Sequence, residues 1–230
     1  MTINGTIVSK LGVRADPEAD DIRVDTRRVG SAQRHRYLLV NKPRGYVTTR
    51  SDPQRRKTVM DLVSGVREYV YPVGRLDYDS EGLLLLTNDG ALAQQLTHPR
   101  GGLIRVYEAV VRGVPTAREL SRFAAGIWLE KRRTAPTEIR LMGSHRTRQQ
   151  DQARVQVTLR EGRNRQVRRM FDAIGHPVLR LRRIQLGPLR DRGLPPGQVR
   201  ELTLRDLDRL RQSLSSGPAP GGSGSAGHTK

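Results

Sequence analysis

The segment from Gly74 to Gly90 constrains the fold of this chain most strongly, because it joins a polar turn to a run of four leucines. It reads Gly-Arg-Leu-Asp-Tyr-Asp-Ser-Glu-Gly-Leu-Leu-Leu-Leu-Thr-Asn-Asp-Gly. A short apolar run between turn residues is typical of a buried strand. Asp77 stands in the turn just before that strand, where a carboxylate can meet a ligand while a rigid element holds it. The segment therefore predicts a buried strand with an acidic group at its mouth.

The charge balance of the chain predicts a polyanionic partner. The 230 residues include 42 Lys and Arg against 23 Asp and Glu, a formal net charge of +19. Such an excess favours nucleic acid, because neutralised phosphates release their counterions. An anionic membrane surface is the alternative, but the sequence has no long apolar segment and no basic amphipathic helix with aromatic anchors. We therefore expect RNA or DNA as the partner and no membrane.

Cysteine usage and the first residues bear on the compartment. The chain has no cysteine, which excludes a disulfide framework, thiol catalysis and cysteine-ligated zinc. The first residues lack the basic, then apolar, then small-residue pattern of a signal peptide. A cytoplasmic protein is the expectation.

The composition changes along the chain and predicts four parts. Residues 1–28 carry an Asn-Gly turn and an alternating stretch, enough for a small hairpin but not for a core. Residues 29–36 form a polar linker, and residues 37–214 form the main domain. Residues 215–230 are rich in Gly, Ser and Pro, a composition that predicts disorder.

The main domain mixes strands and helices without strict alternation. Apolar patterns predict strands at 37–40, 46–49, 103–111, 127–129, 137–141, 155–159 and 178–186. Capping signals predict helices after Asn88 or Asp89, after Thr116 and after Thr203, and an apolar stripe predicts one through Val167 to Ile174. This order of elements favours an α+β fold with a mixed, largely antiparallel sheet.

Residues 74–90 closely resemble the catalytic motif of the RsuA/RluB-type ribosomal RNA pseudouridine synthases. Further motifs of that family follow in the family's order at 41–45, 104–113 and 161–171, so the resemblance covers about residues 37–210. It implies the pseudouridine-synthase fold with a central active-site cleft, and isomerisation of uridine without a metal or cofactor. Residues 1–28 resemble the second half of the S4-type RNA-binding module that usually precedes this domain.

The resemblance implies that Asp77 is the catalytic residue. Taken alone, Asp77, Asp79 and Glu81 could all be solvated turn residues. The reaction must cut the N-glycosidic bond, turn the bound uracil and rejoin it through carbon. A carboxylate can serve as nucleophile or stabilise the electron-poor ribose in such a reaction. Attack on the sugar, attack on the base and assisted elimination all stay open.

Tyr107 and Arg183 are the other predicted catalytic residues. Tyr107 lies in a motif where Arg105 replaces the family's usual lysine, and the tyrosine could stack on the base and move a proton. A tyrosine in a strand is otherwise ordinary core packing. Arg183 resembles an active-site arginine of a late family strand and is the expected partner of Asp77, with Arg75 as the alternative. Phosphate binding is the competing interpretation of Arg183 and its neighbours.

Arginines are unusually dense between Glu161 and Arg183, where seven stand against two acids. Like charges this close repel one another unless anions neutralise them, although a solvated helix face accounts for some of them. The family's second signature also lies here, with groups that can contact phosphates and base edges. The residues predicted to bind RNA are Lys42, Arg44, Arg75, Arg105, Arg163, Asn164, Arg165, Gln166, Arg168, Arg169 and Arg180.

The most specific functional prediction concerns the substrate. Residues 176–189 look most like the RluB branch, which implies 23S ribosomal RNA of the large subunit. A 16S, small-subunit target is the alternative. A non-catalytic RNA-binding or ribosome-assembly protein is the alternative from another class. We expect a monomer.

Overall fold

The computed structural model describes residues 1–10, 12–16, 19–29, 34–98, 102–145 and 151–215. The predicted disordered tail therefore lies outside the described residues beyond Ser215, and part of the predicted linker does too. The chain forms two compact units that divide between His35 and Arg36.

The N-terminal unit is a small sheet rather than the predicted hairpin. Its strands are β1 (Thr2–Ile3), β2 (Thr6–Ile7), β3 (Ile22–Val24) and β4 (Arg27–Arg28), in the order β2-β1-β3-β4. None of its described residues is buried, and Ile7 is 79% exposed. Strands this short, with no helix of their own in the described part, cannot enclose a core.

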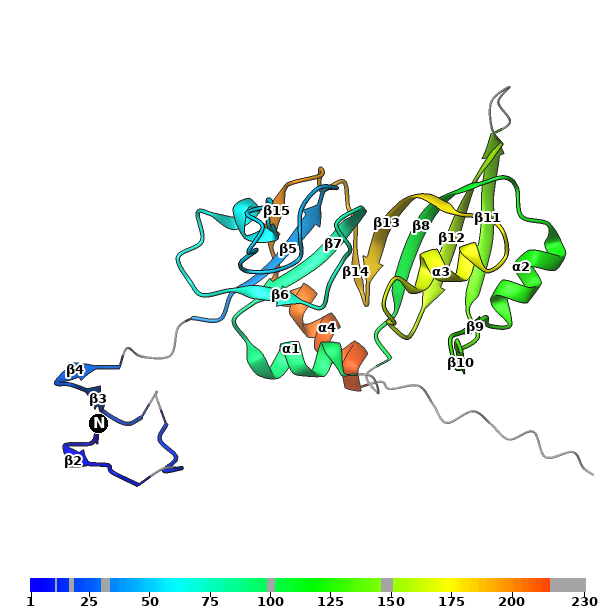
Figure 1. Cartoon of the computed structure of the whole chain (residues 1–230). Helices are drawn as coiled ribbons and strands as arrows, with labels where there is room; N and C mark the ends of the chain where they lie inside the picture. Colours follow the sequence, from blue (N-terminus) through cyan, green and yellow to red (C-terminus); the bar gives the residue numbers. More distant parts are fainter. Residues whose placement is uncertain (11, 17–18, 30–33, 99–101, 146–150, 216–230) are drawn as a thin grey trace, which may run out of the picture. The chain divides into compact units, whose positions relative to one another are not determined.

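A nine-stranded sheet organises the second unit (Figure 1). Its strands run in the order β11 (Glu138–His145), β12 (Gln152–Leu159), β8 (Arg105–Arg112), β13 (Val178–Leu186), β7 (Ser80–Thr87), β5 (Tyr37–Lys42) and β15 (Val199–Glu201), while β14 (Leu189–Arg190) pairs with β13 and β6 (Tyr71–Val73) with β7. Only the pair β13–β7 is parallel among these described strands. The predicted α+β class with a mixed, largely antiparallel sheet is confirmed.

The predicted helix caps are present. Asp89 caps α1 (Gly90–Thr97), and Thr116 with Glu119 forms a capping box on α2 (Ala117–Ala124). The apolar stripe lies on α3 (Gln166–Asp172), and the hydroxyl of Thr203 accepts from Asp206 N at the start of α4 (Leu204–Ser215). None of these four helices, within the described part of the chain, has the length and apolar character needed to cross a membrane.

One predicted strand is wrong, and some short elements were not predicted. Residues 46–49 make a single bridge, Val47 to Thr58, before the 3-10 helix η1 (Val59–Val63). The Thr48 hydroxyl donates to Leu76 O at 2.7 Å, so this segment packs against the loop that carries Asp77 and does not join the sheet. The strand predicted at 127–129 is β9 (Trp128–Leu129), and it pairs with β10 (Arg132–Arg133), which was not predicted, in a hairpin before β11.

The leucine run forms the middle of the core. Leu83 and Leu85 pack in an apolar cluster with residues of α1 and α4, whereas Leu84 and Leu86 pack in a second cluster with η1. Because both faces of β7 are covered, its apolar residues are continuous instead of alternating. A third cluster joins β8 and β12 to α2 and α3. The predicted buried strand is confirmed.

Candidate active site

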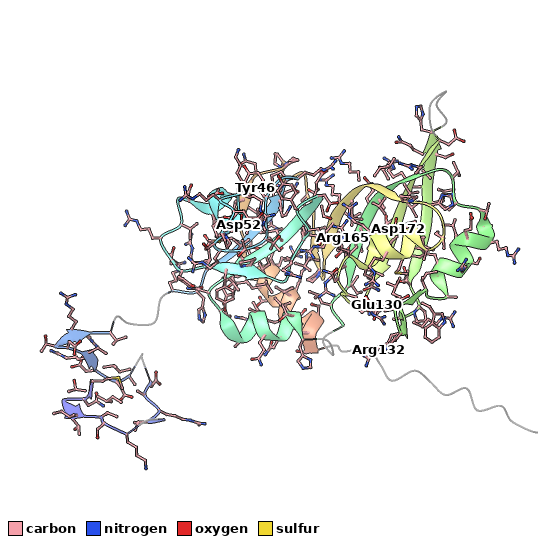
Figure 2. All side chains as sticks on the ribbon, in the orientation of Figure 1. Tyr46, Asp52, Glu130, Arg132, Arg165 and Asp172 are labelled. Atoms are coloured by element: carbon pink, nitrogen blue, oxygen red, sulfur yellow. The ribbon has the colours of Figure 1, made fainter. Side chains whose placement is uncertain are left out.

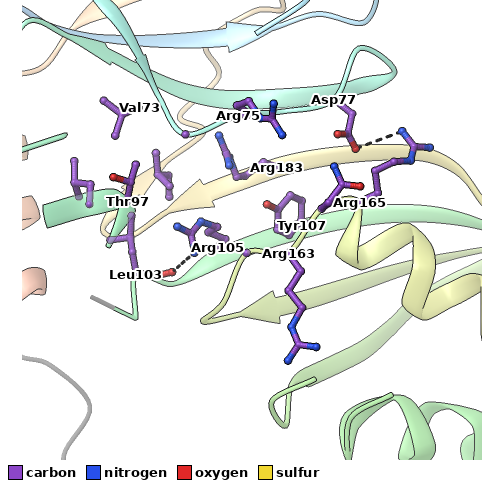
Figure 3. A pocket seen from close by; sticks show the side chains of 15 residues that line it. Val73, Arg75, Asp77, Thr97, Leu103, Arg105, Tyr107, Arg163, Arg165 and Arg183 are labelled. Carbon is purple, nitrogen blue, oxygen red and sulfur yellow. Dashed lines mark hydrogen bonds and ion pairs between the residues drawn. The ribbon is translucent and has the colours of Figure 1, made fainter. Parts of the chain in front are cut away.

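A pocket of about 300 Å³ opens where the α1–α4 cluster and the α2–α3 cluster approach each other on the sheet (Figure 3). All three predicted catalytic residues, Asp77, Tyr107 and Arg183, line it. They meet because β13 lies between β7 and β8, so that Arg183 is opposite both Gly82 and Tyr107. The topology thus brings three distant sequence motifs to one place.

Asp77 sits at the pocket's edge with a partly exposed carboxylate. Its backbone carbonyl accepts from Ser80 N at 3.0 Å, which closes the turn into β7. Its Oδ2 lies 3.6 Å from Arg165 Nη1 (Figure 3). The same guanidinium is 3.3 Å from Asp79. The side chain of Asp77 is 31% exposed, so a ligand can reach it.

The expected ion pair between Arg183 and Asp77 is not formed. Arg183 is 3% exposed, and its Nε donates to Leu83 O at 2.7 Å. Its Nη2 is buried and has no hydrogen-bond partner within the part of the chain that the structure describes. Arg183 therefore lines the pocket with a guanidinium that is only partly hydrogen-bonded by the protein, while Arg165 supplies the nearest positive charge to Asp77. Arg75, the alternative partner, lines the pocket as an exposed side chain.

Tyr107 and Arg105 follow one another on the same face of β8. Tyr107 is partly buried, packs against the α2–α3 cluster and lines the pocket. Arg105 donates to Leu103 O at 3.2 Å. Burial lowers the pKa of Arg105, and the nearby Arg183 lowers it further while Tyr107 opposes the change. The wall beside Tyr107 is thus cationic and suits an anionic or carbonyl-bearing ligand.

Lys42 has a structural position that the sequence did not reveal. It is fully buried, and its Nζ donates to Ser80 O at 2.8 Å and Pro43 O at 3.0 Å. Burial lowers the pKa of Lys42 to about 8, although Asp77 and other nearby acids oppose this. The predicted RNA contact is not supported, because the ammonium group is used to tie the 41–45 turn to the start of β7.

Gln166 and Arg168 are buried as well, which argues against direct RNA contacts. Gln166 Nε2 donates to Glu161 Oε1 at 2.6 Å, and its Oε1 accepts from Arg163 N. Arg168 donates to Asp79 O at 3.1 Å and forms an ion pair with the Asp79 carboxylate at 3.0 Å. Arg168 thus braces the loop of Asp77 through Asp79, whereas Gln166 holds the turn at 161–163 that leads into α3.

The other predicted RNA-binding residues fall into two groups. Arg163, Arg169 and Arg180 already make protein contacts, with the carbonyl groups of Arg132 and Arg133, with Glu130 and with Glu81. Figure 3 shows Arg163 extending away from Asp77. Exposed side chains that line the pocket are Arg75, Asn164 and Arg165, and Arg44 is exposed outside the residues that line it.

Sequence reasoning missed the role of Arg165 as the neighbour of Asp77. Arg165 precedes α3 with a left-handed backbone (φ 46°), which turns its side chain toward the loop before β7. No local signal announces this conformation in an arginine. No group of three or more His, Cys, Asp or Glu suited to a metal ion occurs among the described residues.

Comparison with known proteins gives a consistent result. The sequence model of the family described as RNA pseudouridylate synthase matches residues 36–173. The ribosomal large subunit pseudouridine synthase B of Bacillus subtilis (strain 168) is 42% identical over 215 residues, covering 94% of this chain and 86% of that protein. The ribosomal small subunit pseudouridine synthase A of Yersinia pestis is 32% identical over 210 residues, with 90% and 86% covered.

A solved structure agrees with the sequence relatives. A crystal structure of a pseudouridylate synthase superimposes with a TM-score of 0.69 and 29% identity, covering 91% of this chain and 87% of that one. The family model spans the loop of Asp77, the strand of Tyr107 and the start of α3. The predicted recognition and enzyme class are confirmed, and this chain belongs to the RNA pseudouridylate synthase family.

Proposed function

We propose that this enzyme isomerises a specific uridine of 23S ribosomal RNA, with Asp77 as the catalytic carboxylate. The observation that carries the proposal is the single pocket that holds Asp77, Tyr107 and Arg183 in a member of this family. The large-subunit relative is 42% identical and the small-subunit relative 32% identical, which favours the large subunit. A ribosomal RNA substrate also supports the expected cytoplasmic location.

The geometry suggests how the residues share the reaction. The target uridine leaves its stack and enters the pocket, as bases do in enzymes that modify them. Asp77 then acts at the ribose or the base while the guanidinium of Arg165, 3.6 Å away, holds its position. The free Nη2 of Arg183 is placed to donate to an oxygen of the nucleotide. Because the uracil is rejoined to the same ribose, no group is lost and no electron acceptor is needed.

Tyr107 completes the proposed site. Its ring forms part of the pocket wall and can pack on the uracil while the base turns. Its hydroxyl oxygen can accept, or pass on to water, the proton that must leave carbon 5 once the new carbon–carbon bond forms. The exposed cations Arg75 and Arg165, which line the pocket, and the exposed Arg44 would hold the RNA backbone near the target.

The N-terminal unit would contribute RNA contacts outside the pocket. We propose that residues 1–28 act as a partial S4-like module, in keeping with their separate compact fold. Deleting residues 1–35 should weaken RNA binding but leave the rate at saturating RNA unchanged. We further propose that the enzyme works as a monomer.

The test uses unmodified transcripts of both ribosomal RNAs. The full-length protein is incubated with each transcript, and pseudouridine is mapped by carbodiimide reaction and reverse transcription. We expect one new site in the 23S transcript with the wild type and none with Asp77→Asn. A new site only in the 16S transcript would overturn the substrate proposal. RNA binding without any new site, where the Bacillus subtilis relative works, would favour the non-catalytic alternative.

A further inference from the structure

The β9–β10 hairpin carries the only tryptophan of the chain on its surface. Trp128 is 68% exposed, whereas its neighbour Leu129 is buried in the α2–α3 cluster. The strand alternates, so one side of the hairpin anchors it to the core and the other faces solvent. None of the catalytic roles described above uses this hairpin.

An open groove of about 770 Å³ lies beside the hairpin. It is lined by Leu129, Glu130, Lys131, Arg132, Glu161, Arg163, Asn164 and Arg169. Arg163 and Asn164 also line the catalytic pocket, so the two cavities share a wall. Figure 2 labels Glu130 and Arg132 on the hairpin and Arg165 at the start of α3. A strand of RNA that leaves the pocket past Asn164 therefore meets this groove.

The groove carries positive charge that protein contacts do not neutralise. Its two acids are already used, since Glu130 pairs with Arg169 at 2.9 Å and Glu161 with Arg163 at 3.3 Å. Lys131 and Arg132 are exposed, and neither has an acidic partner within 4.0 Å among the residues that the structure describes. This charge complements a phosphodiester backbone.

The hairpin is also held in place. Arg163 donates to Arg132 O at 3.1 Å and to Arg133 O at 2.7 Å, and Arg133 donates to Gly126 O at 3.2 Å. The two bonds of Arg163 fix the hairpin to the segment that enters α3, the same segment that places Arg165 beside Asp77, and the bond of Arg133 ties it to the end of α2. A prearranged surface loses less entropy on binding than a mobile one.

We propose that this groove binds the RNA strand adjacent to the target uridine, with Lys131 and Arg132 on its phosphates. Trp128, on the same hairpin but outside the residues that line the groove, would stack on a base of that strand next to the groove. Flipping the uridine leaves neighbouring bases partly unstacked, and aromatic side chains are the usual platforms for such bases. The inference rests on the proposed function for its RNA substrate, but it assigns no catalytic role to the hairpin.

The test measures RNA binding in protein that carries Asp77→Asn, so that turnover does not interfere. Lys131→Ala/Arg132→Ala is compared with Arg118→Ala/Arg122→Ala, which removes two exposed cations from α2 outside the groove. The groove variant should bind an unmodified 23S transcript roughly 10-fold more weakly. Its slope of log affinity against log salt should fall by about 1.4, or about 0.7 for each lost phosphate contact on a single strand.

Trp128 provides an independent signal because the chain has a single tryptophan. RNA should quench its fluorescence, and Trp128→Ala should weaken binding at least about 5-fold without changing the salt slope. Unchanged fluorescence at saturating RNA, or equal weakening by the groove and α2 double variants, would overturn the proposal. The latter result would mean that only net charge matters, or that the groove serves a protein partner.

RNA affinity and pseudouridine formation together distinguish a wrong groove proposal from a wrong proposed function. If the groove variants lose RNA affinity but the wild type forms no pseudouridine, the groove binds RNA and the catalytic proposal is wrong. If the wild type forms pseudouridine and the groove variants bind RNA as the α2 control does, only the groove proposal is wrong. When both hold, the groove variants should keep the wild-type rate at saturating RNA.

Discussion

Two arginines approach the proposed catalytic residues in different ways. Arg165 is 45% exposed on its side chain and contacts Asp77 directly, whereas Arg183 lines the pocket as a buried side chain whose Nη2 has no hydrogen-bond partner among the described residues. An exposed cation can move when RNA arrives, but a buried guanidinium fixed to Leu83 O stays where the sheet puts it. We therefore assign orientation of the nucleotide to Arg183.

Replacing Arg183 with lysine tests this assignment. Lysine keeps the positive charge but loses the fork that binds Leu83 O and leaves Nη2 free. We expect the rate at saturating RNA to fall about 100-fold, the typical cost of one preorganised donor, with RNA affinity within about 3-fold of wild type. Single-turnover kinetics and filter binding measure the two quantities. A wild-type rate in Arg183→Lys would contradict the assignment.

The buried Lys42 gives a prediction about pH and stability. Its pKa is lowered from 10.5 to about 8 in the folded protein, so above pH 8 the unfolded chain binds the proton more tightly. The free energy of unfolding therefore rises with pH between about 8 and 10.5, as the cost of burying the charged form is removed. At about 1.4 kcal/mol for each unit of pKa, the change is roughly 3 kcal/mol.

Chemical denaturation of the wild type and Lys42→Met at several pH values isolates this effect. Other titrating groups contribute equally to both proteins, so their stability difference reports on Lys42. We expect the wild type to gain stability relative to Lys42→Met as the pH rises from 7.5 to 10. If the stability difference does not change with pH, or falls as the pH rises, burial does not lower the pKa of Lys42 in the folded protein.

These residues also show what the sequence could and could not predict about the site. Asp77, Tyr107 and Arg183 were predicted together, and the structure places them in one pocket. Lys42 and Arg168 were predicted at the RNA surface but are buried. Their burial depends on contacts with Ser80 and Asp79, which lie 38 and 89 residues away. No local pattern reveals such contacts, and basic residues in a basic segment look like surface.

At the scale of elements, the site depends on the close parallel pairing of β7 with β13. Gly82 has φ +110°, and a Cβ atom there would lie 2.8 Å from the carbonyl carbon of Arg183 and closer still to its oxygen. Both the strained backbone conformation and the collision require glycine at this position. The arrangement of Arg183 over the pocket therefore depends on the absence of a side chain in the neighbouring strand.

Gly82→Ala should therefore destabilise the protein by about 3 kcal/mol, the combined cost of overpacking and an unfavourable φ. Thermal unfolding measures the loss. The matched control is Gly65→Ala, since a Cβ at Gly65 meets no atom within 4 Å and no positive φ is required there. Equal melting temperatures for the two variants would contradict the close pairing.

Local signals predicted most elements of the main domain. Capping residues marked α1, α2 and α4, and the leucine run marked β7, because each signal lies within a few residues of the element that it defines. The strand expected at 46–49 failed since Thr48 bonds to Leu76, 28 residues away. The parallel partner of β7 was also unpredictable, because β13 begins 98 residues after the start of β7 (Ser80 to Val178).

At the scale of the whole molecule, the net charge of +19 governs the encounter with RNA. Neutralising six or more phosphates would make the affinity fall at least about 1,000-fold between 50 and 200 mM salt. Filter binding of an unmodified 23S transcript across that range measures the slope. A flat response would contradict an electrostatic mode of binding, whatever residues form the pocket.

We propose that Asp77 performs the isomerisation in a pocket that binds the nucleotide independently of it. RNA labelled with tritium at carbon 5 of uridine releases the label when that carbon joins the ribose, so tritium release under single-turnover conditions reports the chemical step directly. We predict that Asp77→Asn binds the RNA within about 3-fold of wild type but releases tritium at least about 10⁴-fold more slowly. Release at the wild-type rate by Asp77→Asn would contradict the account.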